Sequence, residues 1–260
     1  MMEKLLEIIR ALRTPGTGCP WDLAQTMRTI VPHTLEEAYE VADAIERDAW
    51  EEIPDELGDL LFQVVFYCRI AEEQGRFDFE AVIGAIVQKL LRRHPHVFGA
   101  RAVDSPQAVA AQWEQIKDAE RRRRNDEAPS ALDDVPLGLP ALTRAHKLQS
   151  RAARVGFDWP AAAPVFGKLE EELAELRECL RDDAVPDAVR GELGDLLFTC
   201  VNLARHLGIE PEGALREASR KFERRFRYVE ATLRADGAEP GTVPLAVLDA
   251  KWDEAKARGL

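Results

Sequence analysis

The chain has 260 residues, of which 46% are hydrophobic and 32% are charged, and its formal net charge at neutral pH is -12. This length and apolar content suffice for one large globular domain or two medium ones. The negative charge argues against general binding to nucleic acid, whose phosphates require a basic surface. The N-terminal segment is charged and amphipathic, and no run of about 18 apolar residues occurs. We therefore expect a cytoplasmic protein with no nucleic-acid or membrane partner.

The most informative feature of the sequence is an internal repeat. The segment ELGDLLF occurs at residues 56–62 and again, 136 residues later, at 192–198. An EExxE pattern precedes each copy, and a basic segment and then a segment beginning with Trp follow it. Four blocks in the same order predict two modules, at residues 1–120 and 141–260. A stretch that contains Pro, Gly and Ser predicts a linker at 121–140.

Apolar residues recur at helical spacing along both modules, starting with Leu5, Ile8, Ile9 and Leu12, and alternating strand patterns are absent. The sequence therefore predicts an all-α fold in which each module packs four or five helices as a four-helix-bundle-like unit. Proline and glycine mark the ends of the two ELGDLLF helices. These residues are Pro54 and Gly75 in the first module, and Pro186 and Gly208 in the second.

Each module carries two pairs of acidic residues at helical spacing. Residues three apart share one helix face, and about sixteen residues separate the pairs, so two antiparallel helices can bring four carboxylates together. Such carboxylates repel one another unless cations lie between them. Oxygen ligands without His or Cys favour Mg²⁺, with Mn²⁺ as a possible substitute. The predicted metal ligands are Glu37, Glu40, Glu56 and Asp59, and Glu172, Glu175, Glu192 and Asp195.

Acidic pairs of this spacing are also common as charge on solvated helix faces. Two features favour metal binding instead: the arrangement occurs twice, and Asp59 and Asp195 adjoin runs of large apolar residues, where we expect them to be buried. The Glu-x-x-His motifs of di-iron bundles are absent, as is the GxxxxGK[ST] phosphate loop. Magnesium bound by carboxylates is therefore the favoured chemistry.

Basic and aromatic residues later in each module are candidates for binding phosphates and a base. They are Lys89, Arg92, Arg93, Trp113 and Lys117 in the first module, and Lys221, Arg224, Arg225, Trp252 and Lys256 in the second. Solvated basic faces and buried Trp anchors are the alternatives. The second module also has Lys168 and Arg190 where the first has His33 and Pro54. We therefore expect the second module to carry most of the turnover.

The EExxE pattern, followed by an ExxD pattern within the segment ELGDLLF, resembles the MazG family of all-α nucleoside triphosphate pyrophosphohydrolases. The repeat resembles the tandem two-module bacterial form of that family. The resemblance implies an ATP-binding, magnesium-dependent hydrolase that converts NTPs and dNTPs to monophosphate and pyrophosphate, with broad base tolerance, as a homodimer. It implies that the eight acids are metal ligands and that Lys221, Arg225, Trp252 and Lys256 contact the nucleotide. A metal-activated water would attack the α phosphorus, with Glu171 or Glu36 as a possible base.

Other functions remain open on the sequence alone. One is a sensor that binds magnesium and nucleotide without turnover, and another is a narrower diphosphohydrolase for dUTP or a damaged nucleotide. A purely structural helical bundle would leave eight acids in repeated register without a ligand. Complete acidic sets in both modules favour the enzyme.

Overall fold

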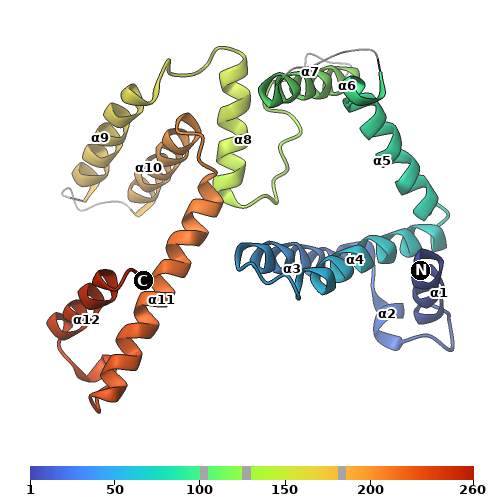
Figure 1. The fold of residues 1–260 in the computed structure, drawn as a ribbon. Coiled ribbons are helices and arrows are strands. Elements are labelled where there is room, and N and C mark those ends of the chain that lie inside the picture. Colours follow the sequence, from blue (N-terminus) through green and yellow to red (C-terminus); the bar gives the residue numbers. More distant parts are fainter. Residues whose placement is uncertain (100–104, 125–129, 181–185) are drawn as a thin grey trace. The chain divides into compact units, whose positions relative to one another are not determined.

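The computed structural model describes residues 1–99, 105–124, 130–180 and 186–260, and within these residues all regular structure is helical (Figure 1). The predicted all-α fold is confirmed. The helices are α1 (Met2–Leu12), α2 (Pro20–Ala24), α3 (Met27–Glu46), α4 (Ile53–Glu73), α5 (Phe79–Arg93), α6 (Pro95–Phe98), α7 (Pro106–Arg124), α8 (Ala141–Arg154), α9 (Ala162–Cys179), α10 (Pro186–His206), α11 (Pro211–Ala235) and α12 (Leu245–Ala257), with a 3-10 turn η1 (Pro240–Thr242). None of the described helices is both long enough and apolar enough to span a membrane.

The chain divides into two compact units, Met1–Ala119 and Glu120–Leu260. Helix α7 continues through Arg124 and so enters the predicted linker, whose residues 125–129 lie outside the described part of the chain. The linker therefore stays a prediction. Within its described residues, the second unit has the predicted number of helices, with five from α8 to α12. The first has more than predicted, because the short helices α2 and α6 each begin at a proline whose fixed φ favours a helical turn.

The first unit is built on a hairpin of α3 and α4, with α1 packed against α4 (Figure 1). A capping box begins α3, in which Thr26 and Thr29 each bond the other's backbone N–H. Arg47 braces the turn between the two helices by pairing with Asp43 and Glu52, each at 2.6 Å. The core that joins the three helices consists of Ile9, Ile30, Val65, Phe66 and Ile70.

The second unit repeats this plan with a hairpin of α9 and α10, against which α8 packs (Figure 1). Helix α12 packs on α11, which in turn contacts α8 and α10. The predicted helix ends are confirmed: α10 begins at Pro186, and Gly75 and Gly208 follow α4 and α10 with φ values of 64° and 69°. Glycine adopts this left-handed conformation without steric cost and so ends a helix cleanly.

Candidate active site

In the second unit, carboxylates from two helices converge. Glu172 on α9 and Glu192 and Asp195 on α10 each place an oxygen within 4.8 Å of the others. Glu172 is 4% exposed and Glu192 is half-buried. Residues 192 and 195 share a face of α10 because they are three apart, and the hairpin turns that face toward α9. The arrangement is the one expected from the sequence for three of the four predicted ligands.

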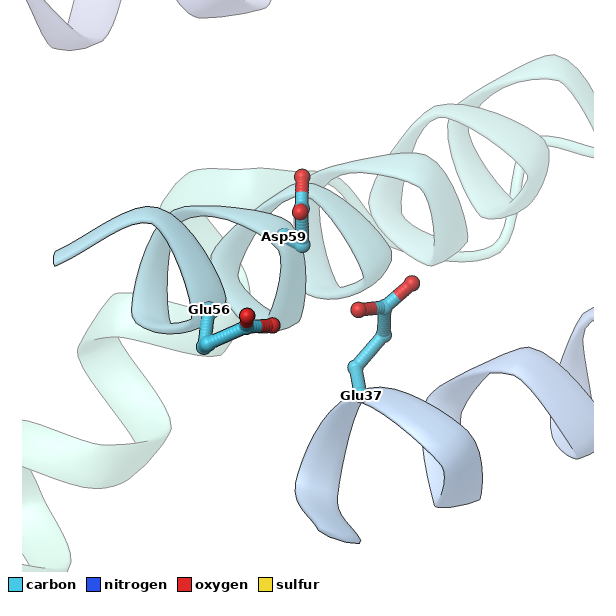
Figure 2. Close-up of side chains that lie close together, drawn as sticks. All are labelled: Glu37, Glu56 and Asp59. Carbon is cyan, nitrogen blue, oxygen red and sulfur yellow. The ribbon is translucent and has the colours of Figure 1, made fainter. Parts of the chain in front are cut away.

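The first unit holds a matching group of Glu37 on α3 with Glu56 and Asp59 on α4 (Figure 2). Gln63 lies one turn beyond Asp59 and donates from Nε2 to Glu37 Oε1 at 3.3 Å. One expectation is wrong in both units: Asp59 and Asp195 are exposed rather than buried. Neighbours in sequence lie about 100° apart around a helix, so an adjoining leucine does not imply burial.

The fourth predicted ligand of each set, Glu40 or Glu175, lies outside these close groups. Desolvation, followed by the charge of Glu37, raises the pKa of Glu40 above its ordinary value. Desolvation, followed by the charge of Glu172, likewise raises the pKa of Glu175. Each of these exposed acids therefore interacts electrostatically with the three clustered carboxylates of its own unit.

A lysine compensates part of the negative charge in the second unit. Lys168 Nζ lies 2.7 Å from Glu172 Oε1 and 2.8 Å from Glu171 Oε1. These bonds, to Glu171 first and then to Glu172, raise the pKa of Lys168 and keep it charged. Arg190 behaves differently, because its side chain is 80% exposed and pairs with Asp187 at 3.3 Å. The structure thus brings Lys168, but not Arg190, into the acidic cluster.

A pocket of about 740 Å³ opens beside this cluster, bounded by α8, α9, α10 and the loop between α8 and α9. Lys168, Glu172 and Asp195 contribute charged groups to its wall. The remaining wall is largely apolar, with a few polar side chains. Its apolar residues include Leu148, Ala152, Phe157, Trp159 and Phe198, and its polar residues include Gln149, Thr199, Asn202 and Arg205.

An ionic contact fixes the loop that carries Trp159. Arg205 on α10 donates from Nη2 to Asp158 Oδ1, and His206 Nε2 lies 3.1 Å from the same oxygen. The hydrogen bond from Arg205 is the main cause that lowers the pKa of Asp158 below its ordinary value. The loop wall of the pocket is therefore tied to α10. Apart from Lys168, Glu172 and Asp195, the residues that line the pocket were not anticipated from the sequence, although the polar Asn202 inside the apolar run LLFTCVNLA is a signal that could have indicated it.

The predicted basic and aromatic residues of the second unit gather on α11 and α12. Arg225 donates to Leu260 O at 2.7 Å and lies 5.7 Å from the Trp252 ring centroid, while Lys256 pairs with Asp253. Lys221 and Arg224 share α11 with Arg225. These residues do not line the pocket. In the first unit, Trp113 packs on His94 and Lys117 pairs with Glu114.

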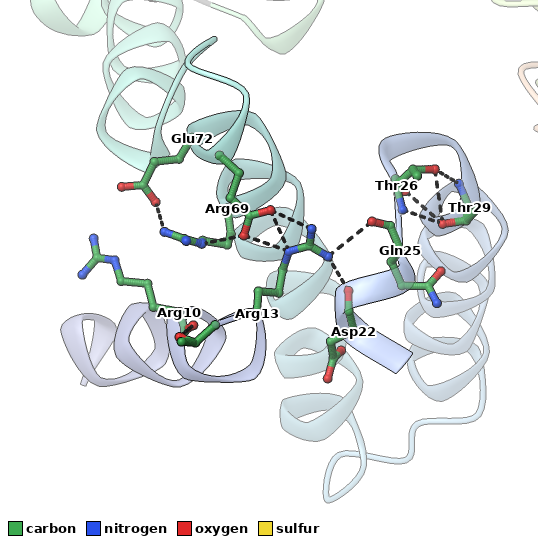
Figure 3. Close-up of polar contacts among 10 residues, drawn as sticks. Arg10, Arg13, Asp22, Gln25, Thr26, Thr29, Arg69 and Glu72 are labelled. Carbon is green, nitrogen blue, oxygen red and sulfur yellow. Dashed lines mark hydrogen bonds and ion pairs between the residues drawn. The ribbon is translucent and has the colours of Figure 1, made fainter. Parts of the chain in front are cut away.

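At the position equivalent to Asn202 of the pocket wall, the first unit has a core side chain. The repeat offset of 136 residues places Phe66 where the second unit has Asn202, and Phe66 is a fully buried core residue beside Ile9 and Ile30. The Arg13 guanidinium lies 5.3 Å from the Phe66 ring centroid. Figure 3 shows Arg13 reaching the backbone of Asp22 and Gln25 from α1. The two units thus share an acidic cluster but differ in what lies beside it.

Comparison with protein families supports the repeat directly. A model described as the MazG nucleotide pyrophosphohydrolase domain matches residues 25–98 and 165–229, one segment in each unit, and these segments contain both acidic clusters. The chain belongs to the MazG family. The predicted family and enzyme class, a nucleotide pyrophosphohydrolase, are therefore confirmed.

Relatives of MazG type extend over nearly the whole chain. The nucleoside triphosphate pyrophosphohydrolase of Escherichia coli strain K12 is 51% identical over 256 residues, which cover 98% of this chain and 97% of that protein. The nucleoside triphosphate pyrophosphohydrolase/pyrophosphatase MazG of Thermotoga maritima is 43% identical over 256 residues, covering 98% and 96%. A crystal structure of a mazG-related protein from Thermotoga maritima aligns with a TM-score of 0.38 and 29% identity over 45% of this chain and 98% of that chain.

Proposed function

We propose that this MazG protein is a magnesium-dependent hydrolase of nucleoside triphosphates, releasing monophosphate and pyrophosphate, and that its second unit is the main active site. The observation that carries the proposal is the juxtaposition of the carboxylates of Glu172, Glu192 and Asp195 with a nucleoside-sized pocket. The names of relatives that match nearly the full chain support the substrate class.

The converging carboxylates fit a hard divalent cation. Their donor set consists of oxygen atoms from three side chains, which suits Mg²⁺ or Mn²⁺ and leaves coordination positions for phosphates and water. We assign Glu172, Glu175, Glu192 and Asp195 to this site and Glu37, Glu40, Glu56 and Asp59 to its counterpart. A bound cation would activate water for attack on the α phosphorus and neutralise charge on the phosphates. Glu171 orients that water in our proposal, and Lys168 binds phosphate oxygens.

The pocket accounts for broad base tolerance in this proposal. A largely apolar cavity of about 740 Å³ has room for either a purine or a pyrimidine nucleoside. The first unit has Phe66 in place of Asn202 and His33 in place of Lys168. We therefore assign it a weaker or structural role, despite its complete acidic group.

We also propose that the chain acts as a homodimer. The side chains of Ile83, Ile86, Val87, Leu90 and Leu91 form an exposed apolar stripe on α5, and such a stripe favours association. In the second unit, the pocket beside the acidic group is not lined by Lys221, Arg224, Arg225, Trp252 or Lys256. A second copy could supply them to the same nucleotide.

Product analysis tests the reaction and its location. Wild type, Glu37→Ala and Glu172→Ala are incubated with a panel of NTPs and dNTPs, with and without Mg²⁺. We expect monophosphate and pyrophosphate from wild type and Glu37→Ala only when Mg²⁺ is present, and a loss of at least a hundredfold in Glu172→Ala. Nucleotide binding without products in wild type would support a sensor and refute the enzyme.

A further inference from the structure

Two buried amide side chains stand out in the wall of the pocket. Gln149 on α8 is 6% exposed and Asn202 on α10 is 8% exposed. Gln149 donates from Nε2 to the backbone oxygen of Phe198 at 2.8 Å, and its Oε1 atom is buried without a hydrogen-bond partner. A buried carbonyl oxygen in this state is unfavourable, and native structures seldom keep one without a reason. The oxygen is therefore a candidate acceptor for a ligand.

The orientation of the second amide is fixed by its neighbour. Arg205 Nη2 donates to Asn202 Oδ1 at 2.9 Å, and Arg205 is itself held by Asp158. Because an arginine side chain can only donate, the amide atom that it contacts is the oxygen, Oδ1. The amide nitrogen, Nδ2, is then a hydrogen-bond donor in a pocket wall that is otherwise largely apolar. The two amides together offer one acceptor and one donor.

Their distance from the acidic cluster suits a nucleoside. Asn202 lies seven residues beyond Asp195 on α10, which corresponds to about 10 Å along the helix axis at ~1.5 Å per residue. A phosphate held near Asp195 would thus leave its ribose and base to extend along α10 toward the level of Asn202. Gln149 lies between these levels, because it bonds to Phe198.

We propose that Gln149 and Asn202 are the specificity-determining residues of the pocket: Gln149 Oε1 accepts a hydrogen bond from an N–H group of the base, and Asn202 Nδ2 donates to a ring nitrogen or carbonyl oxygen. This inference rests on the proposed function of the second unit. Each of the common bases has both a donor and an acceptor, so the pair is compatible with broad base tolerance. It selects against triphosphates whose base lacks an N–H donor.

Binding measurements test the assignment without requiring turnover. Calorimetry with Mg²⁺ compares two ligands: the α,β-methylene analogue of ATP, which cannot be cleaved between those phosphates, and inorganic tripolyphosphate, which has no base. The variants are Gln149→Met, which keeps the length of the side chain, and Asn202→Asp, which keeps an acceptor for Arg205. Gln107→Met, an exposed site on α7, is the matched control.

We expect Gln149→Met and Asn202→Asp each to weaken binding of the ATP analogue by about tenfold, and to leave the affinity for tripolyphosphate and the control unchanged. The same analogue with an N6,N6-dimethylated base should bind wild type about tenfold more weakly, and this difference should vanish in Gln149→Met. Equal losses for both ligands would show a structural role, and unchanged binding would show no role; either result overturns the inference. Failure of the proposed function would instead appear as absent turnover of NTPs by wild type.

Discussion

Replacing Arg13 by methionine should destabilise the first unit selectively. Arg13 is 6% exposed and lies at the end of α1, where it donates to Glu73 on α4 from Nε at 3.1 Å and from Nη2 at 2.7 Å. It also bonds the carbonyl oxygens of Asp22 and Gln25 (Figure 3). Methionine retains the apolar stem but removes every one of these donors.

The expected loss follows from the burial of these partners. Removing one member of a fully buried ion pair costs about 3–5 kcal/mol. Glu73 is 27% exposed and keeps a bond from Arg69 at 2.9 Å, which lowers the cost. Two carbonyl oxygens lose a charged donor, at about 1 kcal/mol or more each. We therefore expect the first unit to lose about 3 kcal/mol of its free energy of unfolding.

Native-state hydrogen exchange measures this loss for each unit separately. Amides of α4 near Val65 and Phe66 should exchange about a hundredfold faster in Arg13→Met, whereas amides of α10 should keep their protection. Arg69→Met is the matched control, because its pairs with Glu72 and Glu73 are local pairs on one helix, worth about 0.5 kcal/mol. An equal loss of protection in α4 for the two variants, or an equal loss in α4 and α10 for Arg13→Met, would refute the conclusion that Arg13 stabilises the first unit selectively.

The remaining predictions concern the second unit. Because Arg205 lowers the pKa of Asp158, their contact stabilises the fold above the ordinary pKa of about 3.9. This stabilisation is lost as the pH falls through the lowered pKa. In acid unfolding monitored by circular dichroism, the loss of stability with falling pH below about pH 4 should therefore be steeper in wild type than in Asp158→Asn. Mg²⁺ at one hundred times its dissociation constant should stabilise wild type by about 2.7 kcal/mol in thermal unfolding, and should stabilise Glu172→Gln much less; equal stabilisation would place the metal elsewhere. If each site of the dimer combines Glu172 of one copy with Lys221 of the other, co-expressed Glu172→Ala and Lys221→Ala chains should recover about a quarter of wild-type turnover, although each variant alone is inactive. No recovery would place both residues in the site of one chain.

Much of the fold was predictable from local patterns in the sequence. The acidic groups could be placed because three-residue spacing fixes a helix face, and a repeated ELGDLLF segment marked the same hairpin twice. Proline and glycine marked helix ends because their backbone preferences act at single positions, as at Pro186 and Gly208. These features depend on residues that are close in sequence.

The pocket depended on contacts that are distant in sequence. Gln149 bonds to Phe198, 49 residues away, and Asp158 pairs with Arg205, 47 residues away. No local spacing relates such residues, so neither the cavity nor its amides could be derived from helix periodicity. The exposure of Asp195 was missed for a related reason, since burial depends on how a helix is rotated against its neighbours.

The two units share an acidic cluster but differ in the side chains packed beside it. Both units converge three carboxylates from an equivalent hairpin, so a cation can be held by either. Beside the cluster, however, one unit has Phe66 in an apolar core and the other has Asn202 in the wall of an open pocket. A filled core increases stability, whereas a cavity decreases it. An open pocket beside the acidic cluster is what the proposed substrate site in the second unit requires, and the filled core of the first unit suits the weaker or structural role that we propose for it.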